Sequence, residues 1–415
     1  MQGKCLMIVI DGMADRPLST LEGKTPLEVA EIPNIHKIAK EGMCGLLHSL
    51  GPGKLPGSDT AHLAILGHDP YKVYTGRGPI EAAGTGLSLQ TGDISLRCNY
   101  ATVDENFTLI NRTADYIREG TEELERVINE RISLSDPSVE FIFRNSADYR
   151  CVLVLRGDDL SPYVSDVDPG EVGKKLLEAR PENTNAEAKK TSALVNEFVK
   201  KTYEVLKDHP VNLARRQANT SPANVIMPRG AGKTPVLEDF YSKWKLKGAC
   251  IAGIGLIKGL GYLTGMDVIK VKGATGYIDT NYEAKGNAAV AALKDHDFVL
   301  LHIEATDEVS HDKDYKAKIT ALEKTDKMIE TILSKIPPKA LLVILSDHTT
   351  STEIAEHTAN PTPIIMWGPT LRVFQDFAEK CTEKEMSKGM LGRIKGTEVM
   401  PIILDLINRS KKFGA

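Results

Sequence analysis

The sequence has little of what marks membrane-spanning, disulfide-rich or nucleic-acid-coating proteins. No window of its 415 residues offers about 18 consecutive apolar residues, the length that a helix needs to cross a bilayer. Its six cysteines are scattered without a Cys-x-x-Cys pair, so we expect reduced and mostly buried thiols. The charge is nearly balanced, with 52 Lys+Arg against 56 Asp+Glu, which argues against nucleic acid or an anionic membrane as a partner. We therefore expect a cytoplasmic protein with a substantial core.

The N-terminal segment does not have the pattern of a signal peptide. Its apolar run covers only Cys5–Ile10, and Asp11 ends the run without a small-residue cleavage site. At about 100 to 200 residues per domain, the length of the chain predicts two domains, with three as the alternative.

Short apolar runs alternate with amphipathic stretches of helical length, which predicts an α/β fold. Continuous apolar runs such as Leu341–Leu345 indicate burial on both faces and hence a central, mostly parallel sheet. The expected strands are Cys5–Ile10, Val152–Leu155, Ala249–Ile254, Phe298–Ile303, Ala340–Leu345 and Pro363–Trp367. The expected helices are Pro33–Glu41, Thr121–Arg131, Ala186–Leu206, Tyr315–Ser334 and Met400–Arg409.

The middle of the chain has a different pattern. From about Gly84 to Arg150, short segments alternate polar and apolar residues and predict a smaller α+β unit. The segment 182–201 is highly charged and predicts a solvated helix with its preceding linker. We therefore expect a discontinuous core domain, residues 1–75 and 236–415, with an inserted domain at 76–235.

Potential metal ligands follow three of the expected strands. In open parallel sheets, ligands bind at the carboxyl ends of the strands, so these side chains are expected to gather there. The candidates are Asp11, Asp307, His311, Asp347, His348 and His357. Carboxylate oxygens and imidazole nitrogens suit divalent Mn or Zn. A single such Asp is more often a helix cap, but six in these contexts predict a metal site, and the adjacent Asp347-His348 pair suits two ions better than one.

Ser58 follows a Gly/Pro-rich approach, and an apolar helical pattern begins just after it. This places the serine at a helix N-terminus, where backbone amides favour an alkoxide or a phosphate. Alone, the pattern also fits a helix-capping serine. Beside a dinuclear metal site, it predicts a nucleophile for attack on phosphorus.

Two cationic side chains have two interpretations each. Lys258, just past a strand, is a candidate phosphate ligand or a surface lysine, and Arg77 is an anion ligand or part of a plain turn.

In order and spacing, these residues resemble the alkaline phosphatase superfamily and, within it, the archaeal-type cofactor-independent phosphoglycerate mutases. The resemblance extends over essentially the whole chain. The motifs that carry it are Leu-Pro-Gly-Ser58-Asp-Thr-Ala-His-Leu-Ala-Ile-Leu-Gly, Gly-Arg77-Gly-Pro-Ile-Glu-Ala-Ala-Gly, Asn224-Val-Ile-Met-Pro-Arg229-Gly-Ala-Gly and His302-Ile-Glu-Ala-Thr-Asp307-Glu. The sequence departs from the family pattern at Glu304 and at Val309-Ser310, where Lys and Ala-Gly are expected.

The resemblance implies an alkaline-phosphatase-like core and a glycolytic and gluconeogenic isomerase. Such an enzyme interconverts 3-phosphoglycerate and 2-phosphoglycerate through a phosphoserine, here on Ser58, without 2,3-bisphosphoglycerate. It implies two divalent ions, Mn first, with Zn, Co or Mg as alternatives. The implied ligands are Asp307, His311 and His357 for one ion, and Asp11, Asp347, His348 and Ser58 for the other. Lys258 matches the lysine that neutralises the transferring group.

The resemblance also implies that the inserted domain binds the small phosphorylated substrate and closes over it, since admitted water would turn a mutase into a phosphatase. The candidate substrate ligands are Arg77, Arg112, Arg150 and Arg229. The sequence makes no prediction of an oligomeric state.

Other functions on the same scaffold are a metal-dependent phosphatase or sulfatase, a mutase-like kinase of a small hydroxy amino acid, and a regulatory protein on an inactive core. The intact ligand set disfavours the inactive core. The inserted domain and the long Ser58 motif favour the mutase, because a simple hydrolase has no need to retain its dephosphorylated product.

Overall fold

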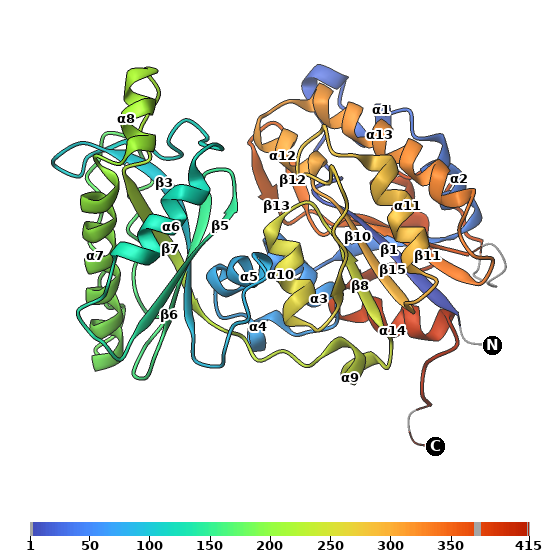
Figure 1. The fold of residues 1–415 in the computed structure, drawn as a ribbon. Helices are drawn as coiled ribbons and strands as arrows, with labels where there is room; N and C mark the ends of the chain where they lie inside the picture. The colour runs from blue at the N-terminus through green and yellow to red at the C-terminus, as the bar shows by residue number, and fades with distance from the viewer. Residues whose placement is uncertain (1–2, 369–374, 413, 415) are drawn as a thin grey trace. The chain divides into compact units, whose positions relative to one another are not determined.

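The computed structural model describes residues 3–368, 375–412 and 414. The chain forms two compact units (Figure 1). The first is built from Met1–Val73 together with Leu237–Ala415, and the second from Tyr74–Val236. Each unit has its own sheet and its own apolar core.

The sheet of the first unit has the strand order β15-β2-β14-β11-β1-β10-β8-β9. Its strands are β1 (Lys4–Ile10), β2 (Met43–His48), β8 (Gly248–Ile251), β9 (Asp267–Val268), β10 (Phe298–Ile303), β11 (Ala340–Leu345), β14 (Thr362–Trp367) and β15 (Gly392–Lys395). Strand β14 runs antiparallel to both of its neighbours, and the other described pairs are parallel. The mostly parallel central sheet is therefore confirmed.

The three central strands consist almost entirely of apolar residues, and all but Lys4 are buried. Strands β10 and β11 flank β1 in parallel register, with Ile10 beside Ile303 and Val9 beside Leu345. Their carboxyl ends therefore meet at one edge of the sheet. The polar residues that follow each strand leave the sheet at that edge.

The helices of the first unit form two groups that pack among themselves. Those of the first group are α1 (Pro26–Val29), α2 (Pro33–Glu41), α11 (Tyr282–Ala292), α12 (Ala305–His311) and α13 (Tyr315–Leu333). Those of the second are α3 (Ser58–Ile65), α10 (Gly255–Leu263) and α14 (Gly396–Leu406). Helices α2 and α13 contribute Ile35, Ile38 and Ile329 to the same buried cluster as Leu6 and Ile8 of β1. Two shorter helices are α4 (Pro70–Val73) and α9 (Phe240–Trp244).

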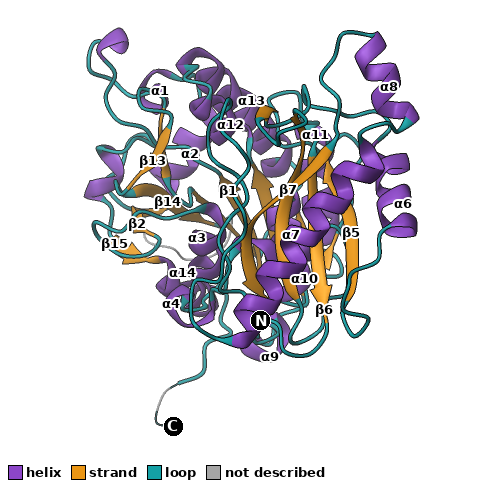
Figure 2. Cartoon of the chain, turned by 90° about the vertical axis from the view of Figure 1, so that its left-hand side faces the viewer, coloured by secondary structure: helices purple, strands orange, loops and turns teal. Residues whose placement is uncertain are grey.

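The second unit is an antiparallel sheet with helices (Figure 2). Its strands are β3 (Ile94–Val103), β4 (Leu109–Asn111), β5 (Glu140–Ala147), β6 (Arg150–Arg156) and β7 (Val225–Lys233). Its helices are α5 (Arg77–Gly84), α6 (Thr121–Arg131), α7 (Ala186–Leu206) and α8 (Pro210–Gln217). Residues of α6 and α7 share one buried cluster with β3 and β6, whereas Ala82 of α5 packs with Val152 and Val154 of β6.

The largest differences from the expected boundaries lie at α14 and at the end of β8, and one helix is less exposed than expected. Helix α14 begins at Gly396 rather than Met400, because the Glu398 carboxylate accepts a hydrogen bond from the Lys395 amide (2.7 Å) and caps an earlier first turn. Strand β8 ends at Ile251, where the chain turns through a glycine-rich segment into α10. Helix α7 has one exposed face and buries the other.

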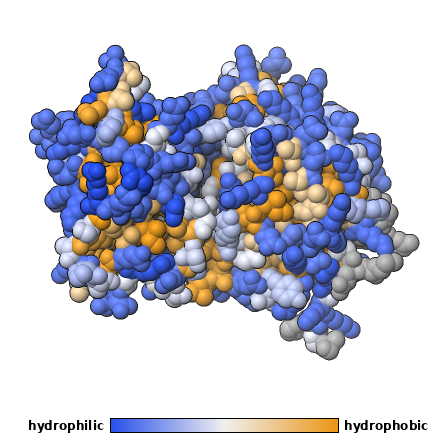
Figure 3. Space-filling view, in the orientation of Figure 1, coloured by the Kyte–Doolittle hydropathy of each residue, from blue (hydrophilic) through white to orange (hydrophobic). Residues whose placement is uncertain are grey.

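The six cysteines are free and buried, as expected. Among the described residues, no helix is long and apolar enough to cross a membrane. Polar and charged residues cover much of the face seen in Figure 3, with apolar residues between them.

Candidate active site

The predicted metal ligands of the first unit come together at the carboxyl edge of its sheet. Asp11 directly follows β1, and Asp307 lies in the first turn of α12, which follows β10. Asp347 and His348 connect β11 to β12 (Thr349–Ser351). His357 lies on β13 (Glu356–Thr358), which forms an antiparallel hairpin with β12.

Asp307, His311 and His357 form a first group of converging donor atoms. The Nε2 atoms of His311 and His357 are 3.2 Å apart. The carboxylate of Asp307 is 3.4 Å from His311 Nε2 through Oδ2 and 3.6 Å from His357 Nε2 through Oδ1. Two imidazoles and one carboxylate in this arrangement are a suitable ligand set for a divalent transition metal.

The second nitrogens of both rings show which atoms face each other. His311 Nδ1 donates to the carbonyl of Ala355 (2.8 Å), and His357 Nδ1 donates to that of Pro56 (2.9 Å). Since carbonyls only accept, both Nδ1 atoms carry the proton and the two Nε2 lone pairs converge. Such a pair requires a cation between the nitrogens. Without a metal a proton can take this place, and the hydrogen bond with Asp307 raises the pKa of His311 to about 9.

Ser58, Asp11, Asp347 and His348 form a second group. His348 Nε2 lies 3.0 Å from Ser58 Oγ, 3.2 Å from Asp11 Oδ1 and 3.3 Å from Asp347 Oδ2. Asp11 Oδ1 and Asp347 Oδ2 are buried and have no hydrogen-bond donor. Burial raises the pKa of Asp347 to about 7, and the negative charge of Asp307 acts in the same direction. Buried carboxylate oxygens without a donor fit the ligands of a second cation.

Ser58 is the first residue of α3, as the sequence predicted. Lys258 lies on α10, and its ammonium donates to the carbonyl of Gly253 (3.2 Å). Burial lowers the pKa of Lys258.

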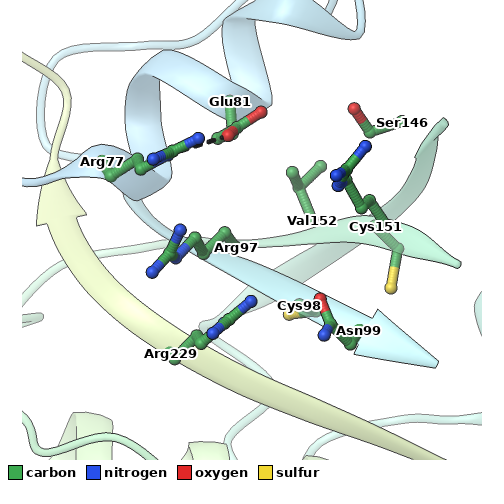
Figure 4. A pocket seen from close by; sticks show the side chains of 10 residues that line it. Arg77, Glu81, Arg97, Cys98, Asn99, Ser146, Cys151, Val152 and Arg229 are labelled. Carbon is green, nitrogen blue, oxygen red and sulfur yellow. Dashed lines mark hydrogen bonds and ion pairs between the residues drawn. The ribbon is translucent and has the colours of Figure 1, made fainter. Parts of the chain in front are cut away.

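The second unit contains a pocket rich in arginine (Figure 4). Its cationic lining residues are Arg77, Arg97, Arg150 and Arg229. They come from the start of α5, the middle of β3, the start of β6 and β7. Arg77 donates to Glu81 (3.0 Å), one turn further along the same helix. Glu81 is the one acidic lining residue, so the pocket is strongly cationic.

Arg97 and Arg229 lie directly opposite each other in the pairing of β3 with β7. Like charges at this position repel. The Nε atoms of both guanidinium groups are buried and have no acceptor. Burial and the neighbouring charges of Arg229 and Arg77 lower the pKa of Arg97 to about 10. A bound anion would relieve this repulsion, so the pocket fits a carboxylate or phosphate group.

Arg112 does not line this pocket. It pairs with Asp168 (2.5 Å), and the same carboxylate oxygen lies 3.3 Å from Arg229 Nη1. Asp168 therefore connects Arg112 to the pocket and braces Arg229.

Comparison with known proteins agrees with this geometry. A family model described as 2,3-bisphosphoglycerate-independent phosphoglycerate mutase matches residues 39–212. A curated 2,3-bisphosphoglycerate-independent phosphoglycerate mutase from Methanocaldococcus jannaschii is 49% identical over 416 residues, covering 100% of both chains. The chain belongs to this family.

Solved structures support the assignment of this mutase family member. A protein from Pyrococcus horikoshii matches with a TM-score of 0.85 and 36% identity, covering 100% of both chains. A cofactor-independent phosphoglycerate mutase from Thermoplasma acidophilum matches with a TM-score of 0.70 and 32% identity, covering 98% of this chain and 100% of the other. A second family model, type I phosphodiesterase / nucleotide pyrophosphatase, matches residues 178–363.

Sequence reasoning missed His302 and His62, which lie beside the candidate ion ligands, and Arg97, which lines the arginine-rich pocket of the second unit. His302 Nε2 lies 3.0 Å from Asp11 Oδ2, and His62 Nδ1 lies 2.7 Å from the carbonyl of Ser58. His302 had a detectable signal, because it is the only polar side chain of the apolar strand β10. The sequence signal for Arg97 was weaker, because Arg97 lies opposite Arg229 only through the pairing of two strands that are far apart in the sequence.

Proposed function

We propose that this protein interconverts 3-phosphoglycerate and 2-phosphoglycerate, without 2,3-bisphosphoglycerate, by transferring the phosphoryl group to and from Ser58. The observation that carries the proposal is the position of Ser58 Oγ. It lies at the start of α3, 3.0 Å from His348 Nε2 and beside two buried carboxylates, Asp11 and Asp347, each of which has one oxygen without a donor. A hydroxyl in that position is suited to nucleophilic attack on phosphorus.

The ion ligands form part of the proposal. Asp307, His311 and His357 would hold one divalent cation, and Asp11, Asp347, His348 and Ser58 the other. Mn²⁺ is the first choice, with Zn²⁺, Co²⁺ and Mg²⁺ as alternatives. When bound, such cations make a hydroxyl more acidic and offset the negative charge of the phosphoryl oxygens.

The proposed reaction consists of two phosphoryl transfers, one to Ser58 and one from it. Ser58 Oγ forms a bond to phosphorus while the bond between phosphorus and the substrate oxygen breaks. Ser58 loses a proton in this step, and the leaving oxygen gains one and becomes a hydroxyl of glycerate. In the second half, the other glycerate hydroxyl attacks the phosphoserine, gives up its proton and regenerates Ser58. No water and no second phosphate donor enters this cycle.

The inserted unit would supply the substrate-binding residues. Arg77, Arg97, Arg150 and Arg229 line one pocket together with a single acidic residue, and this excess of positive charge supports recognition of an anionic group of phosphoglycerate. Arg112 would contribute through Asp168 rather than by direct contact. Lys258 would offset charge on the transferring group, since its half-buried ammonium is a strong local cation. The six free buried thiols support a cytoplasmic location.

The test is turnover of 3-phosphoglycerate coupled to enolase, in protein stripped with a chelator and then resupplied with Mn²⁺. No bisphosphoglycerate is added, and free phosphate is measured in the same sample. The proposal expects metal-dependent formation of 2-phosphoglycerate with no phosphate release. Phosphate release without 2-phosphoglycerate would make the protein a phosphatase and overturn the proposal.

A further inference from the structure

One buried hydroxyl connects the two groups of ion ligands. Thr350 Oγ1 lies 2.5 Å from Asp307 Oδ1, in the first group, and 3.1 Å from His348 Nδ1, in the second. The side chain is fully buried.

The chemistry of the three partners fixes the direction of both hydrogen bonds. A carboxylate that ligates a cation carries no proton, so Asp307 can only accept and Thr350 must donate to it. Having spent its single proton, the Thr350 hydroxyl can only accept from His348. His348 therefore carries its proton on Nδ1, which leaves the Nε2 lone pair free. Nε2 is the atom that faces Ser58, Asp11 and Asp347.

The backbone of Thr350 is held on two sides. Its amide donates to the carbonyl of Ala14 (3.2 Å), and its carbonyl accepts from the buried ammonium of Lys318 (2.8 Å). In the β12–β13 hairpin, Thr350 is paired directly with His357, itself a ligand of the first group. These backbone contacts therefore fix the position of the Thr350 hydroxyl.

The space around the hydroxyl is also restricted. A Cβ atom added at Gly12 would lie 2.6 Å from Thr350 Oγ1 and 2.9 Å from Asp307 Oδ1. The bridge therefore depends on glycine at the position directly after Asp11.

We propose that Thr350 is a positioning residue that lets Asp307, at one ion position, set the tautomer of His348 at the other. This inference rests on the proposed two-ion site. Without the hydroxyl, His348 Nδ1 would be buried without an acceptor, and the tautomer with its proton on Nε2 would become accessible. That tautomer cannot ligate a cation through Nε2. An outer partner of this kind typically contributes 10- to 100-fold in metal affinity.

The test is a Mn²⁺ titration of the metal-stripped chain, in which the electron paramagnetic resonance signal of free Mn²⁺ counts the unbound ion. Thr350→Val removes the hydroxyl at constant shape, and Thr350→Ser keeps it. Thr349→Val is the matched control, because the neighbouring buried hydroxyl donates only to the carbonyl of Asn360 (3.2 Å). We expect two ions per wild-type chain, and one of them bound about 10- to 100-fold more weakly in Thr350→Val. The Thr350→Ser and Thr349→Val chains should bind like wild type.

The outcomes separate the inference from the proposed function. A wild-type chain that takes up no Mn²⁺ would overturn the two-ion site itself. Two ions in wild type with an unchanged isotherm for Thr350→Val would overturn only the role of Thr350. Equal weakening in Thr349→Val would show a general packing effect and would also overturn it.

A second measurement determines the tautomer of His348 directly, without the Thr350→Val variant. Nitrogen-15 chemical shifts of labelled histidines in metal-free wild-type protein distinguish the two tautomers of a neutral ring. We expect the His348 signals to show the proton on Nδ1, assigned by their loss in His348→Gln. A proton on Nε2 would contradict the proposed direction of the hydrogen bonds.

Discussion

The Nε2 atoms of His311 and His357 lie 3.2 Å apart, although each ring already donates from Nδ1 to a backbone carbonyl. Two lone pairs at this separation repel unless a cation lies between them. A cation between these two nitrogens would therefore stabilise the carboxyl edge of the main sheet. The carboxylate of Asp307, 3.4 Å from His311 Nε2, is the third donor of the proposed ion site.

Replacing His357 should remove one ion and nearly all mutase activity. His357→Leu deletes one of the three proposed ligands of the first group, so we expect one Mn²⁺ per chain instead of two and a rate lower by on the order of 10³-fold. Metal analysis after gel filtration and the enolase-coupled rate provide the measurements. His296→Leu is the control, because His296 also bonds a carbonyl and a carboxylate but lies outside both groups. Two ions retained by His357→Leu would contradict the assignment.

Adding a methyl group at Gly12 should damage the ion site more than the fold. The new Cβ would lie 2.6 Å from Thr350 Oγ1, and φ is +59° at this position. Gly23→Ala is the matched control, because φ is +78° there and nothing lies within 4 Å of its Cβ. Both variants should lose about 1–2 kcal/mol of unfolding free energy from backbone strain, and only Gly12→Ala should lose Mn²⁺ affinity. Equal affinities in the two variants would be evidence against the crowded site.

Replacing Arg97 should weaken substrate binding without destabilising the free protein. Arg97→Met removes a partly buried guanidinium that lies opposite Arg229 in the strand pairing, so the repulsion disappears together with the proposed anion ligand. We expect KM for 3-phosphoglycerate to rise about 10- to 100-fold, with an unfolding temperature equal to or above that of wild type. Arg144→Met, at an exposed arginine paired with Glu125, is the control. An unchanged KM would remove Arg97 from the substrate site.

Ion uptake should release a proton at neutral pH. The hydrogen bond with Asp307 raises the pKa of His311 to about 9 in the metal-free protein, so the ring is protonated at pH 7 and must lose that proton to ligate. Apparent Mn²⁺ affinity should therefore rise with pH until about pH 9 and then level off as far as His311 is concerned. Calorimetry at pH 7 in two buffers with different ionisation enthalpies measures the release. Identical heats in the two buffers would show that no proton leaves.

The elements that local pattern decides were predictable from the sequence. Phe298–Ile303 and Ala340–Leu345 coincide with β10 and β11, because an uninterrupted apolar run bounded by polar residues suits a strand buried on both faces. Pro33–Glu41 coincides with α2, where a proline occupies the first turn. The start of α14 was missed because it depends on a side-chain cap rather than on apolar spacing.

Residues that act through tertiary contacts were not predictable. The proposed role of Thr350 arises because the fold brings its hydroxyl within hydrogen-bond distance of both Asp307 and His348, which are far apart in the sequence. Arg97 matters because β3 pairs with β7, more than a hundred residues later. Neither relationship leaves a periodic signal in the sequence.

Detection of a phosphoryl group on Ser58 during turnover is the most direct test of the proposed mechanism. Metal-reconstituted protein is mixed with 3-phosphoglycerate and quenched in acid within milliseconds, and its peptides are mapped by mass spectrometry. We expect a phosphoryl group on the peptide that contains Ser58, and we expect it to be absent after chelation and in Ser58→Ala. Two results would contradict the account. One is a Ser58→Ala variant that forms 2-phosphoglycerate at the full rate, and the other is a phosphoryl group found on a different residue.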